Sequence, residues 1–211
     1  MPMVSKSRAD KAGERLRRGL SDVDVSAEDL VPEFLLMAEW RAQHAVALTK
    51  TTLGLRSAVN TALSLPPSGR VVSRLKREEQ IIKKLVRDRT RLSSMTDIAG
   101  CRAVLDRQSD VDRVLDRIEA GARKLEIVRV RDYVRQEEHP TGYRAVHILG
   151  RRDDYPVEIQ LRTAAQHDWA SRVERYDRTT GEDLKHGMAD EQALTVVRRL
   201  SQTLAKLDDD G

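Results

Sequence analysis

Hydrophobic side chains recur at helical spacing through the first third of the chain. Ser26 and Asp29 form an S-x-x-D signature, which is typical of the start of a helix. Beyond them the apolar positions are Leu30, Phe34, Met37, Ala45, Leu48 and Leu55. This spacing predicts one long helix, or two, from about residue 27 to residue 63. The segment 66–69, which reads P-P-S-G, ends the helical region.

Compact apolar runs alternate with amphipathic stretches in the middle of the chain. A charged stretch over 74–92 and the apolar spacing over 111–122 each predict a helix. Strands are predicted at 98–105, 125–130, 143–149 and 157–162. A turn over 150–156 joins the last two, and Thr163 is placed to cap a following helix. This order favours an α/β (α+β) fold, a mixed β-sheet flanked by helices.

The length of the chain fits one well-buried domain with additional helices. Residues 1–25 are polar and basic, and we expect a frayed or weakly helical arm, with contact to RNA as an alternative role. Residues 26–211 form the expected single domain. Its parts are N-terminal helices over 26–65, a core over 70–170 and a leucine-rich C-terminal helix over 188–208.

Composition narrows the classes of protein and of ligand. The net charge of +4 suits an anionic ligand such as a nucleotide or RNA, although an arginine-rich composition explains it equally well. The single cysteine, Cys101, excludes an internal disulfide framework and a cysteine-built zinc site. No apolar run approaches the roughly 20 residues that cross a bilayer, and no apolar segment follows the basic N-terminus. We therefore expect a cytoplasmic protein without a membrane partner.

Polar side chains alternate with apolar ones on the last two predicted strands. Within 157–162, Glu158, Gln160 and Arg162 share one face, because successive side chains on a strand point to opposite sides. On the preceding strand, Tyr143 and His147 share a face in the same way. If the two strands pair as a hairpin, these side chains gather on one patch. An ordinary solvated sheet face is the alternative interpretation.

A second candidate group precedes the first predicted strand. Asp97 sits at the mouth of that strand, where a carboxylate can hold Mg²⁺, and Gly100 allows a ligand to approach the backbone. A turn or capping aspartate is the alternative. The basic residues upstream, including Arg74, Lys76 and Lys84, can grip phosphates through charge-assisted hydrogen bonds, or they form a solvated helix face.

The candidate residues belong to an ordered set of motifs. These are R-x-K at 74–76 with Lys84 downstream, T-D-I-A-G-C-R at 96–102, R-D-Y at 131–133, G-Y-R-A-V-H at 142–147 and V-E-I-Q-L-R-T at 157–163. A helix that carries His167 and Trp169 follows. Together the motifs resemble the synthetase domain of the RelA/SpoT family and, in size, the small alarmone synthetases. The resemblance covers about residues 70 to 170.

The resemblance implies a nucleotidyltransferase-like fold and a Mg²⁺-dependent transfer of the β,γ-diphosphate of ATP to the 3′-hydroxyl of GDP or GTP, with release of AMP. It implies that Asp97 and Glu158 are the catalytic and metal-binding carboxylates. The implied ATP-binding residues are Arg74, Lys76, Lys84 and Arg102. The implied acceptor-binding residues are Tyr143, which stacks on guanine, and Arg144, His147, Gln160 and Arg162.

The chain departs from the family pattern before Tyr143. Members usually carry a lysine there, in a P-K-x-x-G-Y pattern, whereas residues 137–143 read E-E-H-P-T-G-Y. This departure and the basic N-terminal arm keep one alternative open: a toxic synthetase that modifies the 3′ end of tRNA or adenine nucleotides, for which an antitoxin is a possible partner. An inactive regulator that binds nucleotide or RNA is an alternative of another class, and the presence of both Asp97 and Glu158 argues against it. The helix over 188–208 fits either a homotetramer interface or packing on its own domain.

Overall fold

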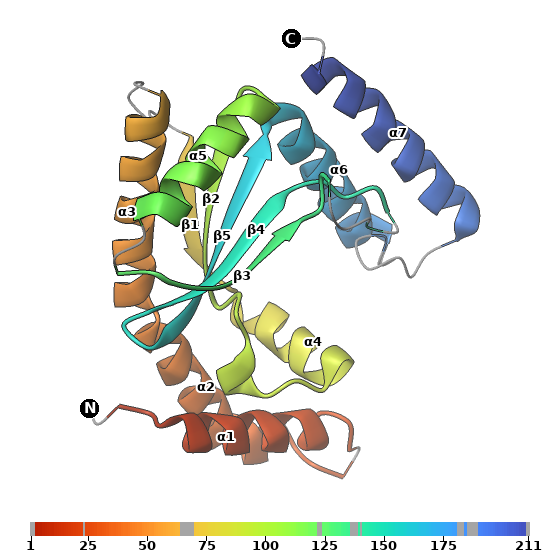
Figure 1. Ribbon diagram of the computed structural model, residues 1–211. Coiled ribbons are helices and arrows are strands. Elements are labelled where there is room, and N and C mark those ends of the chain that lie inside the picture. The colour runs from red at the N-terminus through yellow and green to blue at the C-terminus, as the bar shows by residue number, and fades with distance from the viewer. Residues whose placement is uncertain are drawn as a thin grey trace.

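A five-stranded mixed sheet forms the centre of the molecule (Figure 1). The computed structural model describes residues 3–22, 24–63, 70–121, 124–135, 139, 141–180, 184 and 190–209. The strands are β1 (Val71–Leu75), β2 (Ala99–Leu105), β3 (Glu126–Asp132), β4 (Val146–Arg152) and β5 (Tyr155–Thr163). Their order is β1-β2-β5-β4-β3, with β2 and β5 parallel and the other pairs antiparallel. The predicted mixed sheet is thus confirmed.

The two faces of the sheet differ in what covers them. Helices α3 (Ala45–Leu63) and α5 (Gln108–Gly121) pack on one face, over an apolar core to which β2 contributes Ala99, Cys101, Ala103 and Leu105. The opposite face carries the alternate, polar side chains. Helices α6 (Ala164–Thr180) and α7 (Glu191–Asp209) flank it on one side, and α4 (Glu78–Asp88) lies near the end of the sheet where β2 begins (Figure 1). The polar face is therefore available to a ligand.

The N-terminal segment is a packed helix, and the prediction of a frayed or weakly helical arm is wrong. Helix α1 (Lys6–Gly19) begins after Ser5, whose hydroxyl accepts a hydrogen bond from the Arg8 amide. Its small and apolar residues, including Ala9 and Leu16, are buried against α2 (Val31–Gln43) and the segment that follows α4. The basic residues conceal this narrow apolar stripe in the sequence.

The predicted helical region that follows divides in two. Ser26 and Asp29 make the expected reciprocal contact, because the Asp29 amide donates to the Ser26 hydroxyl and the Ser26 amide donates to the Asp29 carboxylate. Ser26 precedes one turn of 3₁₀ helix, η1 (Glu28–Leu30), Asp29 lies within that turn, and α2 and α3 follow. The terminating segment 66–69 lies outside the described residues, as do residues 137, 138 and 140 of the stretch 137–143 that lacks the family's lysine.

Arg74 lies on a strand, although the sequence predicted a helix from that position. Arg74 belongs to β1 (Val71–Leu75), which pairs antiparallel with the start of β2. Helix α4 begins only at Glu78, after Arg77 in an extended conformation, and a short 3₁₀ helix, η2 (Leu92–Ser94), follows it. The tertiary pairing overrides the helical preference of the charged residues.

The predicted hairpin of the last two strands is confirmed, but its turn is tighter than expected. Strands β4 and β5 extend to Arg152 and from Tyr155, so Asp153 and Asp154 alone form the loop. Both aspartates have positive φ, at 51° and 67°, a conformation that matches strand twist in two-residue hairpins and that Asp tolerates. The first of the two strands begins at Val146, so Tyr143 precedes it.

Helix α7 packs on its own domain. Leu194 is buried with Tyr143 and Trp169, and the Trp169 indole donates to the Val197 carbonyl over 2.9 Å. Of the two interpretations of the C-terminal helix, packing on the domain is the one that the structure bears out. No helix in the part of the chain that the structure describes is long and apolar enough to span a bilayer.

Candidate active site

Two rows of residues cross the polar face of the sheet. In one row Arg74, Gly100 and Glu158 lie side by side on β1, β2 and β5. In the next row Arg102, Gln160, His147 and Arg131 follow one another on β2, β5, β4 and β3. Residues directly opposite each other on neighbouring strands point to the same face, so these side chains share one surface. The pairing of strands distant in sequence assembles the site.

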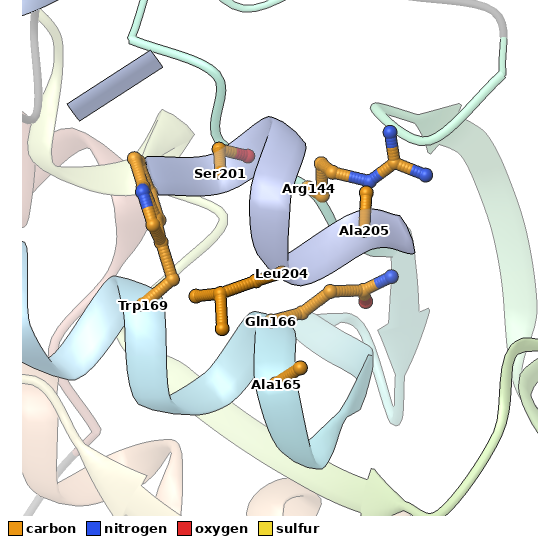
Figure 2. Close-up of a pocket in the computed structure, with 7 residues that line it drawn as sticks. All are labelled: Arg144, Ala165, Gln166, Trp169, Ser201, Leu204 and Ala205. Atoms are coloured by element: carbon orange, nitrogen blue, oxygen red, sulfur yellow. The ribbon is translucent and has the colours of Figure 1, made fainter. Parts of the chain in front are cut away.

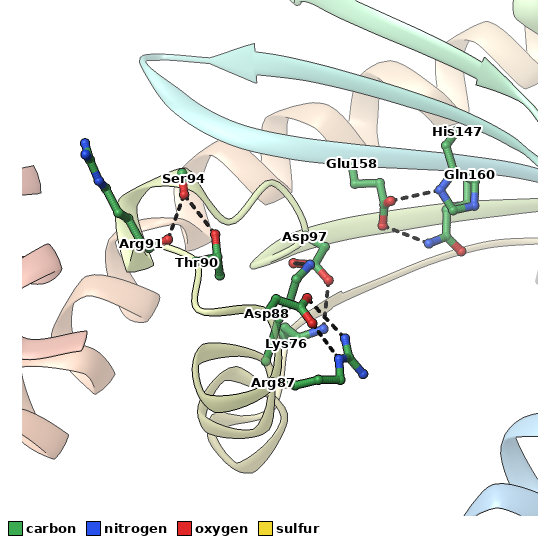
Figure 3. A network of polar contacts seen from close by, with 11 residues as sticks. Lys76, Arg87, Asp88, Thr90, Arg91, Ser94, Asp97, His147, Glu158 and Gln160 are labelled. Atoms are coloured by element: carbon green, nitrogen blue, oxygen red, sulfur yellow. Dashed lines mark hydrogen bonds and ion pairs between the residues drawn. The ribbon is translucent and has the colours of Figure 1, made fainter. Parts of the chain in front are cut away.

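Glu158 is the centre of a hydrogen-bonded network (Figure 3). Its carboxylate lies 3.0 Å from His147 Nδ1 and accepts a hydrogen bond of 2.8 Å from the Gln160 amide. The Gln160 carbonyl in turn accepts one of 2.9 Å from Arg162. Burial acts to raise the pKa of Glu158, but the hydrogen bonds from His147 and Gln160 outweigh it and leave the pKa below its ordinary value. Glu158 is therefore a carboxylate at neutral pH.

Tyr143 joins this network through its hydroxyl. The phenol oxygen lies 2.6 Å from His147 Nε2 and accepts a hydrogen bond of 2.6 Å from Arg162 Nη2. The convergence of Tyr143, His147, Glu158, Gln160 and Arg162 that the alternation predicted is thus confirmed. Burial raises the pKa of Tyr143 to about 12, so its hydroxyl stays protonated.

The ring of Tyr143 does not have the open face expected of a stacking platform. The side chain is nearly buried, and the rings of Tyr133 and Trp169 lie 5.6 Å and 6.2 Å from it. The guanidinium carbon of Arg162 lies over the ring, 5.0 Å from its centroid. A purine that stacks on Tyr143 would have to displace one of these neighbours, which reach it from β5, from α6 and from the segment after β3.

Asp97 is bound by two lysines at the mouth of β2. Lys76, just after β1, donates to one carboxylate oxygen over 2.7 Å, and Lys84, on α4, donates to the other over 3.0 Å (Figure 3 shows Lys76 and Asp97). Burial acts to raise the pKa of Asp97, but the two ammonium groups lower it to about 2. The negative charge of Asp97 also acts to raise the pKa of Glu158, so the two carboxylates lie within electrostatic reach of each other.

The chemistry of this donor set fits Mg²⁺. Asp97 and Glu158 supply carboxylate oxygens, which this ion prefers. Within the described ranges no cluster of three or more His, Cys, Asp or Glu side chains is placed to hold a metal. A Mg²⁺ site with two protein carboxylates is ordinary, because the ion usually keeps several waters and takes phosphate oxygens as its remaining ligands.

Arg102 adds positive charge to the same face and contacts a residue to which the sequence analysis assigned no role. Its Nη1 lies 2.9 Å from His167 Nδ1 on α6. Burial and the nearby Arg102 lower the pKa of His167, which favours a neutral imidazole that accepts this hydrogen bond. Nε of Arg102 is buried without a hydrogen-bond partner among the described residues. Such a donor is suited to an anionic ligand.

Arg131 and Tyr133 also belong to the site region and were not among the predicted site residues. Arg131 pairs with His147 across β3 and β4 and donates to the Tyr133 hydroxyl over 3.2 Å. The ring of Tyr133 lies 5.3 Å from that of His147. The signal in the sequence was the R-D-Y motif at 131–133, whose first and last residues face the site. Asp132, the middle residue, accepts hydrogen bonds from the following turn.

Arg144 lies apart from the network, although it was grouped with the acceptor-binding residues. It lines a small pocket between α6 and α7 with Gln166, Trp169 and Ser201 (Figure 2). The Arg144 side chain is thus next to the C-terminal helix. The positions of Arg74, Lys76, Lys84 and Arg102 are compatible with a shared phosphate site, whereas Arg144 lies apart from the other residues that were assigned to the acceptor.

The Cys101 side chain lies on the core side of β2, and its reactivity can be predicted from this position. Burial, and then the negative charge of Glu158, raise the pKa of this thiol to about 12, from an ordinary value of 9.0. At pH 8 the thiolate is therefore about a thousandfold scarcer than for a free thiol, and the thiolate is the reactive form. We expect Ellman's reagent to modify the folded protein about a thousandfold more slowly than the protein in guanidinium chloride. Because the chain has a single cysteine, the signal comes from Cys101 alone. Equal rates in the two states would contradict this burial.

Comparison with known proteins identifies relatives of the chain. Residues 73–177 match the family described as "Region found in RelA / SpoT proteins". The GTP pyrophosphokinase YwaC of Bacillus subtilis (strain 168) is 32% identical over 148 residues, which are 63% of this chain and 70% of the relative. Residues 73–177, which match the family, contain both rows of site residues.

Solved structures support the same relationship. Small alarmone synthetase 2 from Bacillus subtilis is 26% identical, with a TM-score of 0.64, and the match covers 86% of this chain and 95% of that one. Small alarmone synthetase 1 from the same organism, bound to its product pppGpp, has a TM-score of 0.65 at 23% identity, over 79% of this chain and 90% of that one. Residues 73–177 contain both carboxylates, Asp97 and Glu158, and the four basic residues Arg74, Lys76, Lys84 and Arg102, and the chain belongs to the RelA/SpoT-type family of pyrophosphotransferases.

Proposed function

We propose that this protein transfers the β,γ-diphosphate of ATP to the 3′-hydroxyl of GDP or GTP, forming (p)ppGpp and AMP. The observation that carries the proposal is that two carboxylates and four cations gather at the polar face of the sheet and at the adjoining end, where β2 begins. Asp97 lies three residues before Gly100, which pairs with Glu158 on the neighbouring strand. Arg102 lies on β2, next to β5, Arg74 lies on β1 beside Gly100 of β2, and Lys76 and Lys84 contact Asp97.

The cations are suited to the triphosphate of ATP. Diphosphate transfer depends mainly on positioning and on neutralisation of charge, with little covalent participation by the protein. Lys76 and Lys84 bind different oxygens of Asp97, while Arg102 is held by His167. Their convergence orients the phosphates, and Gly100 leaves room for them between Arg74 and Glu158.

Glu158 is suited to act on the acceptor. A carboxylate can accept the proton of an attacking hydroxyl, and hydrogen bonds from His147 and Gln160 hold Glu158 in its charged form. Asp97 and Glu158 would hold Mg²⁺, which neutralises charge on the transferred phosphates when it is bound. The guanine base binds near Tyr143 once Arg162, which lies over the ring, moves aside.

The test offers several acceptors side by side. The full-length protein is incubated with ATP labelled in the γ-phosphate, Mg²⁺ and one of GDP, GTP, ATP or deacylated tRNA, and the products are separated by thin-layer chromatography. We expect label in a 3′-pyrophosphorylated guanine nucleotide, together with AMP. Label in tRNA or in an adenine product, with none in guanine nucleotides, would overturn the proposed acceptor. No transfer to any acceptor would overturn the proposed activity.

A further inference from the structure

The two oxygens of Asp97 are each bound to a different lysine, and the lysines come from different elements. Lys76 follows β1, and its backbone amide is fixed to the Ile98 carbonyl next to Asp97. Lys84 projects from α4, where its neighbours Ile81 and Leu85 anchor the helix in the core. The side chains of Asp97, Lys76 and Lys84 are only 19%, 16% and 25% exposed. Water therefore screens these ion pairs far less than surface pairs.

We infer that Lys76 and Lys84 form a latch that keeps Mg²⁺ away from Asp97 until the phosphates of a nucleotide draw both ammonium groups off the carboxylate. The inference rests on the proposed function, in which Asp97 is a metal ligand and the lysines bind ATP. It adds a rule for the order of events: the metal enters the site together with the nucleotide. A divalent cation alone does not occupy this site at ordinary concentrations.

Electrostatics explain the latch. A divalent cation that approaches Asp97 alone meets two ammonium groups at hydrogen-bond distance from the same carboxylate, and both repel it. The oxygens of Glu158 are also engaged, by His147 and Gln160. When phosphates arrive, each lysine exchanges one oxyanion for another, so it loses little in leaving Asp97. The same phosphates then provide the oxygen ligands that Mg²⁺ lacks in the free protein.

The latch is tested with Mn²⁺ as the metal probe and no nucleotide present. Free Mn²⁺ is measured by its electron paramagnetic resonance signal as the metal is titrated into the full chain. For the wild type we expect weak binding, and for Lys84→Met at least tenfold tighter binding, because one oxygen of Asp97 is released. Lys76→Met should show the same gain, which keeps the test valid if one variant does not fold. Circular dichroism verifies folding.

Two control variants make the result specific. Lys83→Met removes an exposed lysine next to Lys84 and should bind Mn²⁺ as the wild type does. Adding Asp97→Asn to Lys84→Met should abolish the gain. Wild-type binding as tight as that of the lysine variants, or a gain that survives Asp97→Asn, would overturn the latch. The titration contains neither ATP nor an acceptor, so its outcome is separate from that of the transfer assay.

Discussion

Replacing Glu158 by glutamine is expected to lower the rate of diphosphate transfer by about a thousandfold or more. The substitution keeps the size of the side chain and removes the charge that is proposed to accept the proton of the attacking hydroxyl. A positioned general base typically contributes about a hundred- to ten-thousandfold to a rate. The loss of one proposed Mg²⁺ ligand adds to the effect. The measurement is kcat with saturating ATP and GDP, from the formation of AMP.

A matched variant separates this effect from a change in folding. Glu126 is exposed at the start of β3, so Glu126→Gln makes the same chemical change outside the site and should leave kcat unchanged. The melting temperature of Glu158→Gln should fall by only a few degrees: the glutamine oxygen can still accept a hydrogen bond from His147, but its NH2 group faces the Gln160 amide, which donates to Glu158 in the wild type. A Glu158→Gln enzyme that retains more than a tenth of wild-type activity would contradict the role assigned to this carboxylate.

Valine at position 100 is expected to block catalysis while the protein remains folded. A Cβ built on Gly100 meets a single neighbouring atom within 4 Å, the Arg74 carbonyl oxygen at 3.9 Å, so the protein itself has room for a side chain there. That room lies between Arg74 and Glu158, where the phosphates of ATP are proposed to bind. We expect kcat/KM for ATP to fall by at least about a hundredfold, which corresponds to a loss of about 3 kcal/mol in transition-state stabilisation.

The control for Gly100→Val places the same residue on the other side of the sheet. Ser73 is exposed on β1 and pairs with Cys101, so its side chain points away from the site. Ser73→Val should leave the kinetics unchanged. In denaturant titrations Gly100→Val should unfold within about 1 kcal/mol of the wild type, since valine suits a strand and relieves the entropy cost of glycine. Wild-type kinetics in Gly100→Val would mean that no ligand crosses the sheet at this point.

The face that carries the chemistry could be predicted because it follows from alternation. Glu158 and Gln160 alternate with Val157 and Ile159, and a strand with that pattern turns its polar side chains away from the core. A hairpin partner with the same period then places His147 beside Gln160. Alternation along a strand and pairing within one hairpin are local relations, so they can be predicted from the sequence without the rest of the fold.

Other features depend on contacts between segments distant in sequence and could not be predicted in this way. Tyr143 is covered by Trp169 and by Arg162, and neither spacing nor composition reveals such a tertiary contact. Arg74 is a strand residue because β2 is available to pair with it, in spite of the charged residues that follow. The apolar stripe that contains Ala9 and Leu16 can be recognised as a buried surface only when the helices on which it packs are known.

The parallel pairing of β2 with β5 has a consequence for biosynthesis. It places Gly100 beside Glu158 and so brings the segment that carries Asp97 close to Glu158. The same pairing closes a long loop that contains α5, β3 and β4. Contacts of high sequence separation form late, because the chain must lose the entropy of the intervening loop first. A nascent chain on the ribosome therefore cannot consume ATP until β5 has emerged from the exit tunnel. Catalytic activity thus requires translation to proceed beyond Thr163, the last residue of β5.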